Sequence, residues 1–223
     1  MTPGAPASPA TAVTGTFGTF AELMDAAAIQ LEDHEAYVEV ATGRRLTFGE
    51  WHCAADAAAA RMASSGIGPG DVIAIALPPS IDYAIACAAV LRLGAVATGI
   101  NTRLGPRETA AIVAGCEPRL VIDDTYALHG GRGLPRSPAE TAPDDPAVII
   151  WTSGTTGLPK GAWFDHRNLA AAVRTAGAMT QPFDRRLSGV PMAHAGYMAK
   201  LWEQCAMGAV SYTHLTLPTN REV

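Results

Sequence analysis

The 223-residue sequence is long enough for one large domain or two modest ones with a substantial core. Apolar residues make up 48% and charged residues 17%, which is typical of a soluble globular α/β protein and excludes a disordered chain. The net charge of −5, without a basic patch, argues against a nucleic-acid partner, because phosphate contacts need clustered lysine and arginine.

The cysteines and the amino-terminal residues indicate the cellular compartment in which the protein is expected. Four scattered cysteines show no metal-type spacing, so we expect buried free thiols and a reducing cytoplasm; they are Cys53, Cys87, Cys116 and Cys205. Residues 1–19 have neither the charged start nor the apolar centre of a signal peptide. Residues 84–100 are apolar but interrupted by Arg92, which favours a buried helix and strand over a membrane span.

Helices are predicted where apolar residues recur with a 3.6-residue period behind a capping residue. Thr19 and Ser80 are expected N-caps, and Thr47 with Glu50 forms a capping box. Asp165 or His166 is expected to cap a later helix, with His166 favoured. The predicted helices cover residues 20–31, 48–66, 80–93, 106–115, 167–179 and 198–207.

Strands are predicted at short apolar runs between turn residues. A hairpin is expected around Thr42-Gly43, and residues 126–146 are expected to form a surface loop. The predicted strands cover residues 36–40, 45–48, 71–77, 95–99, 119–122, 147–151, 161–164 and 187–190. Alternation of strands and helices predicts an α/β fold with a mostly parallel sheet and helices on both faces.

One loop carries most of the functional signal. It follows the apolar strand 147–151 and combines glycines, hydroxyl side chains and one lysine. Its residues are Thr152, Ser153, Gly154, Thr155, Thr156, Gly157, Leu158, Pro159, Lys160 and Gly161. Glycines allow several backbone N–H groups to point into one concavity, hydroxyls add donors, and a lysine adds a compact charge, so the loop is suited to phosphate. A Walker-type NTPase is disfavoured, because Lys160 is followed by glycine and an apolar run.

The ten-residue loop closely resembles the phosphate-binding signature of the adenylate-forming superfamily, which includes acyl-CoA synthetases, peptide-synthetase adenylation domains and luciferases. Three further segments are similar: Asn101-Thr102-Arg103-Leu104, His166-Arg167-Asn168-Leu169 and Pro191-Met192-Ala193-His194. The resemblance implies a partial amino-terminal domain of the acyl-adenylate-forming fold over residues 19–210, after a flexible leader at 1–18.

The resemblance also implies an activity: ATP-dependent conversion of a carboxylic acid to an acyl-adenylate, then transfer to coenzyme A, as in fatty acid metabolism. ATP would be held by Thr152, Ser153, Gly154, Thr155, Thr156, Gly157 and Lys160. Lys160 would act catalytically by offsetting the charge on the departing pyrophosphate. Mg²⁺ is implied, although the sequence shows no ligand cluster for it.

His194 has two readings. The resemblance places it beside the substrate carboxylate, whereas a lone histidine can equally be a packing or hydrogen-bonded residue under a loop. Asn101 is expected to hold a turn through side-chain-to-backbone bonds.

The family's later elements, including its ribose-binding aspartate and its small carboxy-terminal domain with a catalytic lysine, do not occur in these 223 residues. We therefore expect a fragment that is inactive alone. Residues 211–223 resemble a translated sequencing adapter and are expected to be a non-native tail.

The leading interpretation is part of an acid–thiol ligase. Alternatives are a fatty acyl-AMP ligase, a peptide-synthetase adenylation domain, a non-catalytic nucleotide-binding module or a dead fragment. Asn101-Thr102-Arg103-Leu104 favours CoA ligases over adenylation domains, which usually carry Asp-Pro in this segment.

Overall fold

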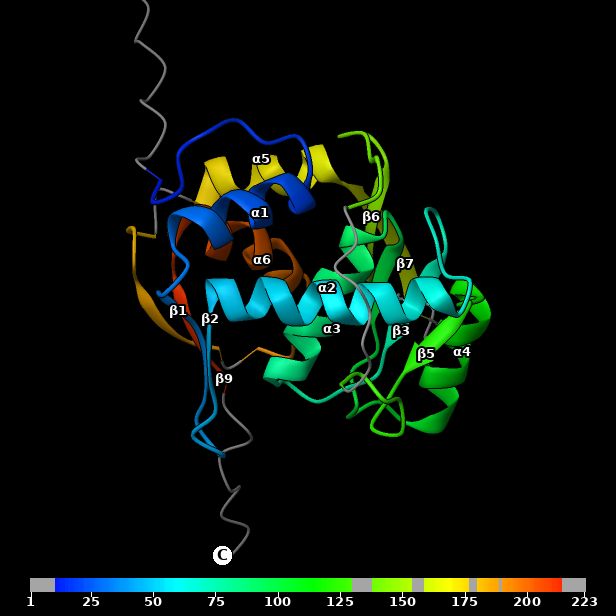
Figure 1. Ribbon diagram of the computed structural model, residues 1–223. Coiled ribbons are helices and arrows are strands. Elements are labelled where there is room, and N and C mark those ends of the chain that lie inside the picture. The colour runs from blue at the N-terminus through cyan, green and yellow to red at the C-terminus, as the bar shows by residue number, and fades with distance from the viewer. Residues whose placement is uncertain (1–10, 130–137, 154–158, 177–179, 189, 214–223) are drawn as a thin grey trace, which may run out of the picture.

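The structure is a computed structural model that describes residues 11–129, 138–153, 159–176, 180–188 and 190–213. Two β-sheets lie on opposite sides of a layer of helices (Figure 1). The helices are α1 (Phe20–Gln30), α2 (Phe48–Ser64), α3 (Ile81–Arg92), α4 (Pro106–Cys116), α5 (His166–Ala176) and α6 (Ala195–Met207). The strands are β1 (Glu35–Glu39), β2 (Arg45–Thr47), β3 (Val72–Ile75), β4 (Val96–Gly99), β5 (Leu120–Ile122), β6 (Pro146–Ser153), β7 (Pro159–Asp165), β8 (Arg185–Ser188) and β9 (Val210–Thr213).

The larger sheet has five strands in the order β5-β3-β4-β6-β7, and only the β6–β7 pairing is antiparallel. The smaller has four strands in the order β2-β1-β9-β8, in which β9 runs parallel to both β1 and β8. The predicted α/β class with mostly parallel strands and flanking helices is confirmed. The division into two sheets was not predicted, because it depends on pairing between residues as distant as Tyr37 and Ser211.

Helix α3 lies between the sheets and contacts β1, β3 and β4. Eleven of its twelve residues are buried, which explains why its sequence is apolar on every side. Helix α4 covers the other face of the five-stranded sheet, where Ile112 packs with Ala74 and Ile100. The apolar run at residues 84–100 is therefore a buried helix and strand, as predicted. Among the described residues, no helix combines the length and apolar character needed to cross a membrane.

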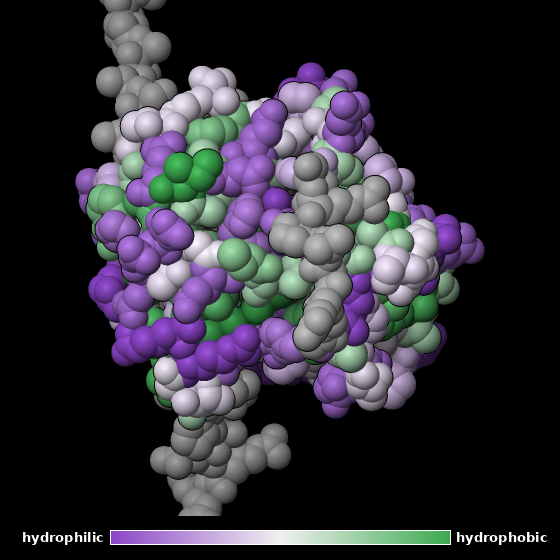
Figure 2. Space-filling model, in the orientation of Figure 1, coloured by the Kyte–Doolittle hydropathy of each residue, from purple (hydrophilic) through white to green (hydrophobic). Residues whose placement is uncertain are grey.

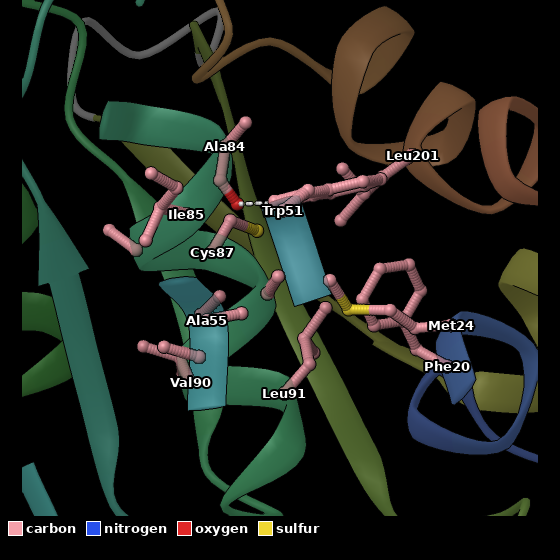
Figure 3. Packing of buried hydrophobic residues seen from close by; sticks show 14 of the residues in the cluster. Phe20, Met24, Trp51, Ala55, Ala84, Ile85, Cys87, Val90, Leu91 and Leu201 are labelled. Carbon is pink, nitrogen blue, oxygen red and sulfur yellow. Dashed lines mark hydrogen bonds between the residues drawn. The ribbon is translucent and has the colours of Figure 1, made fainter. Parts of the chain in front are cut away.

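The core centres on Trp51 of α2, which is fully buried among side chains of α1, α3 and α6 (Figure 3). Its Nε1 donates a hydrogen bond of 3.2 Å to the Ala84 carbonyl oxygen, so the indole polar group is satisfied in the interior. Phe20 contributes a tilted ring contact, with centroids 6.2 Å apart. One contiguous cluster thus joins the helices to both sheets.

Most of the predicted helix starts are confirmed. Thr19 and Thr47 each form a capping box, and the Ser80 side chain accepts from the Tyr83 amide. His166, in contrast, is not a cap. The Asp165 carboxylate accepts from the Asn168 amide at 2.6 Å, while His166 is the first residue of α5 and is buried.

The cysteine prediction is correct in part. All four cysteines are free, and Cys87 and Cys205 are buried, but Cys53 is exposed and Cys116 is half-buried. Cys53 lies on the outer side of α2, a position that an alanine-rich helix does not reveal.

The predicted domain limits stay predictions. Residues 1–10 lie outside the described residues, whereas Val13 is buried and its amide donates to the Ala206 carbonyl. Residues 211–213 belong to β9, so this strand crosses the limit expected at residue 210. Residues 214–223 lie outside the described part.

Candidate functional site

The predicted phosphate loop joins two antiparallel strands. Thr152 pairs with Lys160, and Ser153 pairs with Pro159, so β6 and β7 form a hairpin and the loop connects the two strands next to these pairs. Figure 1 shows both strands at one end of the five-stranded sheet. The predicted binding residues Gly154, Thr155, Thr156 and Gly157 lie outside the described residues, as does Leu158.

The end of the hairpin that carries the Ser153–Pro159 pair lies at the carboxyl edge of the parallel strands. Thr98 of β4 pairs in parallel with Ile149 of β6, and Asn101 and Thr152 each follow three residues later in the chain. Asn101, just past the end of β4, and Thr152, near the end of β6, therefore lie at the same edge of the sheet. In open α/β sheets this is the edge outside which ligands bind.

Trp151 holds the last residues of β6 before the loop in place. Its Nε1 donates to the Thr98 hydroxyl at 2.8 Å, and that hydroxyl donates to the Ile149 carbonyl at 3.1 Å. The indole also lies close to two glycines: an added Cβ would come within 2.9 Å of it at Gly115 and within 3.2 Å at Gly161. The end of β6 is thereby fixed on both sides.

Lys160 is exposed and makes no ion pair with any residue in the described ranges. Its carbonyl oxygen accepts from the Thr152 hydroxyl at 3.4 Å, which ties the two strands together just below the loop. No carboxylate in the described residues therefore neutralises this ammonium.

His194 is the N-cap of α6, and its exposed ring bonds back to the helix. The Gly196 amide donates to Nδ1 at 3.1 Å. The helix begins at Ala195, three residues before the predicted start at Met198, because the cap lies in a segment that the sequence reads as a loop.

The segment before His194 lies beside the end of β4. A small cavity of about 40 Å³ is lined by residues 101–103, which follow β4, by residues 190 and 191, and by Pro79 and Ser188. Asn101 Oδ1 accepts from the Arg103 amide at 3.0 Å, so the predicted side-chain turn is confirmed. Lys160 and His194 thus belong to segments that both reach the carboxyl edge.

His166 lies away from this edge. Its Nδ1 accepts from the Phe20 amide at 3.2 Å, and its ring packs against Trp202. Burial lowers the pKa of His166, although nearby carboxylates, Asp145 first among them, act in the opposite direction. The ring is a neutral structural acceptor between α1 and α5.

Two residues near this edge were not predicted from the sequence as part of the site: Gly99 at the end of β4 and Tyr83 of α3. A glycine inside a predicted strand signals a bulge or a close backbone approach, and this signal could have identified Gly99. Tyr83 offers no comparable signal.

A larger groove of about 890 Å³ lies over α1 and α2, and no predicted site residue lines it. Its charges disfavour a triphosphate, since the carboxylates outnumber the cationic side chains. The face shown in Figure 2 is mainly hydrophilic, with smaller hydrophobic patches between the polar residues. The groove's ionisable residues are Asp25, Glu32, Asp33, Glu50, His52, Cys53, Asp56 and Arg92.

Comparison with known protein families identifies the family of the chain that carries this edge. The model of the AMP-binding enzyme family matches residues 24–212. The chain belongs to this family. The match runs through the β6–β7 hairpin and the start of α6, so the AMP-binding family pattern includes both parts of the candidate site.

Individual relatives include ligases and peptide synthetases. The chain is 32% identical over 190 residues to the long-chain-fatty-acid–CoA ligase FadD13 of Mycobacterium tuberculosis, covering 72% of this chain and 38% of that protein. It is 31% identical over 159 residues to the nonribosomal peptide synthetase NPS2 of Ceriporiopsis subvermispora, covering 62% of this chain and 6% of that protein. The chain thus spans much less than two thirds of either relative.

The fold is that of known amino-terminal domains. The crystal structure of the N-terminal domain of FACL13 from Mycobacterium tuberculosis superposes with a TM-score of 0.81 at 23% identity, covering 89% of this chain and 57% of that one. At this identity the likeness establishes the fold alone.

Proposed function

We propose that this chain is the amino-terminal part of an acid–thiol ligase that activates a carboxylic acid with ATP and passes the acyl group to coenzyme A. The observation that carries the proposal is Lys160 on the β6–β7 hairpin at the carboxyl edge of the parallel sheet: its side chain is exposed and forms no ion pair within the described residues. Membership of the AMP-binding family and the similarity to FadD13 support it.

In the proposed reaction a carboxylate oxygen attacks the α-phosphorus of ATP. The bond from that phosphorus to the oxygen bridging to the β-phosphate breaks, and pyrophosphate leaves. The chain's part is to hold the phosphates and to neutralise the developing charge. Thr152 and Ser153, the following loop residues and Lys160 would bind the β- and γ-phosphates, and Lys160 would stabilise the leaving pyrophosphate. His194 would lie beside the acid.

Transfer to coenzyme A forms a thioester and releases AMP. Mg²⁺ would accompany the phosphates of ATP, but no group of three or more His, Cys, Asp or Glu side chains in the described residues could hold a metal ion. We therefore assign no step to the metal. We also propose that the chain alone neither adenylates nor thioesterifies, since it spans 38% of a relative such as FadD13.

A peptide-synthetase adenylation domain is the second candidate, and the similarity to NPS2 favours it. It shares the adenylation step and differs in the thiol acceptor, which would be a carrier-protein thiol. Presenting both acceptors to a full-length protein that carries this region separates the two.

The small number of lysines allows a controlled test of the role of Lys160 in ATP binding. Lys160 and Lys200 are the two lysines of the chain, and both are exposed. Lys200 sits on α6, 3.7 Å from Glu203. Titration calorimetry with ATP and with a non-hydrolysable acyl-adenylate mimic should show binding that Lys160→Ala weakens about 10-fold or more, because a charge-assisted bond is lost.

Lys200→Ala is the matched control and should leave both affinities unchanged. Equal weakening by the two variants would contradict the role of Lys160, and no binding by the unmodified chain would favour a dead fragment. ATP–pyrophosphate exchange by the chain alone would refute the proposed inactivity.

A further inference from the structure

Gly99 occupies a position with no room for a side chain. An added Cβ would overlap the Tyr83 hydroxyl and come within 2.5 Å of the Ala193 Cα and 2.7 Å of its Cβ. Two of these contacts are with the residue directly before His194. The end of β4 therefore supports the backbone of the 191–194 segment by direct contact, without a gap that could absorb a shift.

Tyr83 holds the same segment from the side of α3. Its side chain is fully buried, and its hydroxyl donates to the Met198 sulfur at 3.9 Å. Its ring meets the Tyr197 ring edge-on, with centroids 6.0 Å apart. The amides of both contacted residues bond to the His194 carbonyl, at 2.9 Å from Tyr197 and 3.2 Å from Met198. Tyr83 thus contacts the first turn of α6, which receives His194.

The cap hydrogen bond determines the form of the His194 ring. A backbone N–H can only donate, so Nδ1, which receives the Gly196 amide, must be the unprotonated nitrogen. In the neutral ring the hydrogen is then on Nε2. Nε2 has no hydrogen-bond partner among the residues the structure describes, and the ring is exposed. The Nε2–H group is available as a donor.

We propose that Tyr83 and Gly99 are positioning residues for His194: they seat the 191–194 segment so that Nδ1 stays bonded to the α6 cap and Nε2–H is presented to an oxygen of the bound acid. The claim about substrate depends on the proposed function. The claim about the ring does not, because it concerns the free chain alone.

Nitrogen NMR of the histidine-labelled chain tests the proposal, with His194 assigned from a His194→Asn variant. At a pH where the ring is neutral, the unmodified chain should show the Nε2–H tautomer. Gly99→Ala should shift His194 toward a mixture of tautomers, because the added methyl pushes on Ala193. Tyr83→Phe should do so to a smaller extent, because the ring remains.

Two control variants separate positioning from general damage. Gly68→Ala places its methyl in open space, and Ala97→Gly weakens the same buried strand without pressing on Ala193. Both should keep the tautomer of the unmodified chain. An Nδ1–H tautomer in the unmodified chain would overturn the proposal, as would unchanged signals in Tyr83→Phe and in a folded Gly99→Ala.

Binding of the acyl-adenylate mimic provides a second readout. Loss of one neutral hydrogen bond predicts affinity about 2- to 10-fold lower in Gly99→Ala and unchanged in Gly68→Ala. Equal affinities would overturn the substrate claim. If the unmodified chain binds no mimic, the proposed function fails for this chain, while the tautomer measurement still decides whether Tyr83 and Gly99 position the ring.

Discussion

Arg92 places a positive charge between helices α1, α2 and α3, where its side chain is only 3% exposed. Its Nη1 lies 2.5 Å from Asp25 Oδ1, and its Nε lies 2.5 Å from Asp56 Oδ1. The Nε2 atom of His52 lies 2.8 Å from the same Asp25 oxygen. Burial opposes ionisation of Asp25, but hydrogen bonds from His52 and Arg92 outweigh it and lower the pKa of that carboxyl. The network joins three helices through one guanidinium.

Arg92→Met should therefore lower the free energy of unfolding by about 3–5 kcal/mol, because it removes the guanidinium 2.5 Å from the buried Asp56 carboxylate and leaves it only the His52 ring, at 3.7 Å. Arg119→Met is the control: that pair with Asp71 is exposed and 3.4 Å long, so about 1 kcal/mol or less is expected. Urea unfolding measures both. Adding Asp56→Leu to Arg92→Met should recover much of the loss, and equal effects of the two single variants would contradict this account.

His166 predicts a pH dependence near neutrality. Its folded-state pKa lies below the ordinary value of 6.5, so below that pH the unfolded chain binds the proton more readily and stability falls. His166→Gln keeps an acceptor for the Phe20 amide but does not titrate. Its stability should change less between pH 7.5 and about 5.5 than that of the unmodified chain. The free energy of unfolding is measured by urea titration at each pH for both proteins. If it changes equally with pH in His166→Gln and in the unmodified chain, His166 does not cause the pH dependence.

Each capping box stabilises the start of a single helix, as in α2. The Thr47 hydroxyl accepts from the Glu50 amide at 3.1 Å, and the Glu50 carboxylate accepts from the Thr47 amide at 2.9 Å. Both partners lie within one turn, so the signal is readable from four residues of sequence. The start of α6 is different, because a histidine does the capping.

Thr47→Ala should cost about 1 kcal/mol of unfolding free energy, because the first turn of α2 loses one acceptor. Thr47→Ser keeps the hydroxyl and should stay close to the unmodified chain. Thermal unfolding followed by circular dichroism distinguishes the two variants. If serine is as costly as alanine, the methyl group and not the cap is responsible.

One main hydrophobic cluster extends from α1, α2, α3, α5 and α6 to strands of both sheets, while α4 packs through a second, smaller cluster. Trp51 lies at the centre of the main cluster, in contact with Tyr37 of β1, with ring centroids 5.0 Å apart. The same side chain bonds to Ala84 of α3, whose helix packs on β3 and β4. The two sheets are thereby coupled through the helical layer.

We expect a single cooperative unfolding transition, with coincident curves from far-ultraviolet circular dichroism and tryptophan fluorescence. Trp51→Ala should lower stability by about 3–5 kcal/mol and move both curves together, because a large cavity opens between the sheets. Curves that separate in the variant would indicate that the sheets unfold independently.

The sequence by itself determined the local structure and predicted phosphate chemistry for the loop. Caps at Thr19, Thr47 and Ser80 and the strands around residues 152–160 follow from residues a few positions apart, whose interactions are formed within the element. The same stretch, with its glycines, hydroxyls and Lys160, also indicated phosphate chemistry.

Tertiary structure decided what depends on residues that meet only after folding. The parallel pairing of β1 with β9 creates the second sheet, and the approach of Ala193 to Gly99 gives the His194 segment its place. His166 was predicted to cap a helix, but in the structure it is a buried acceptor for the Phe20 amide. No local pattern specifies the partners in these contacts, because each contact joins segments separated by about a hundred residues or more and forms only when the core packs around both.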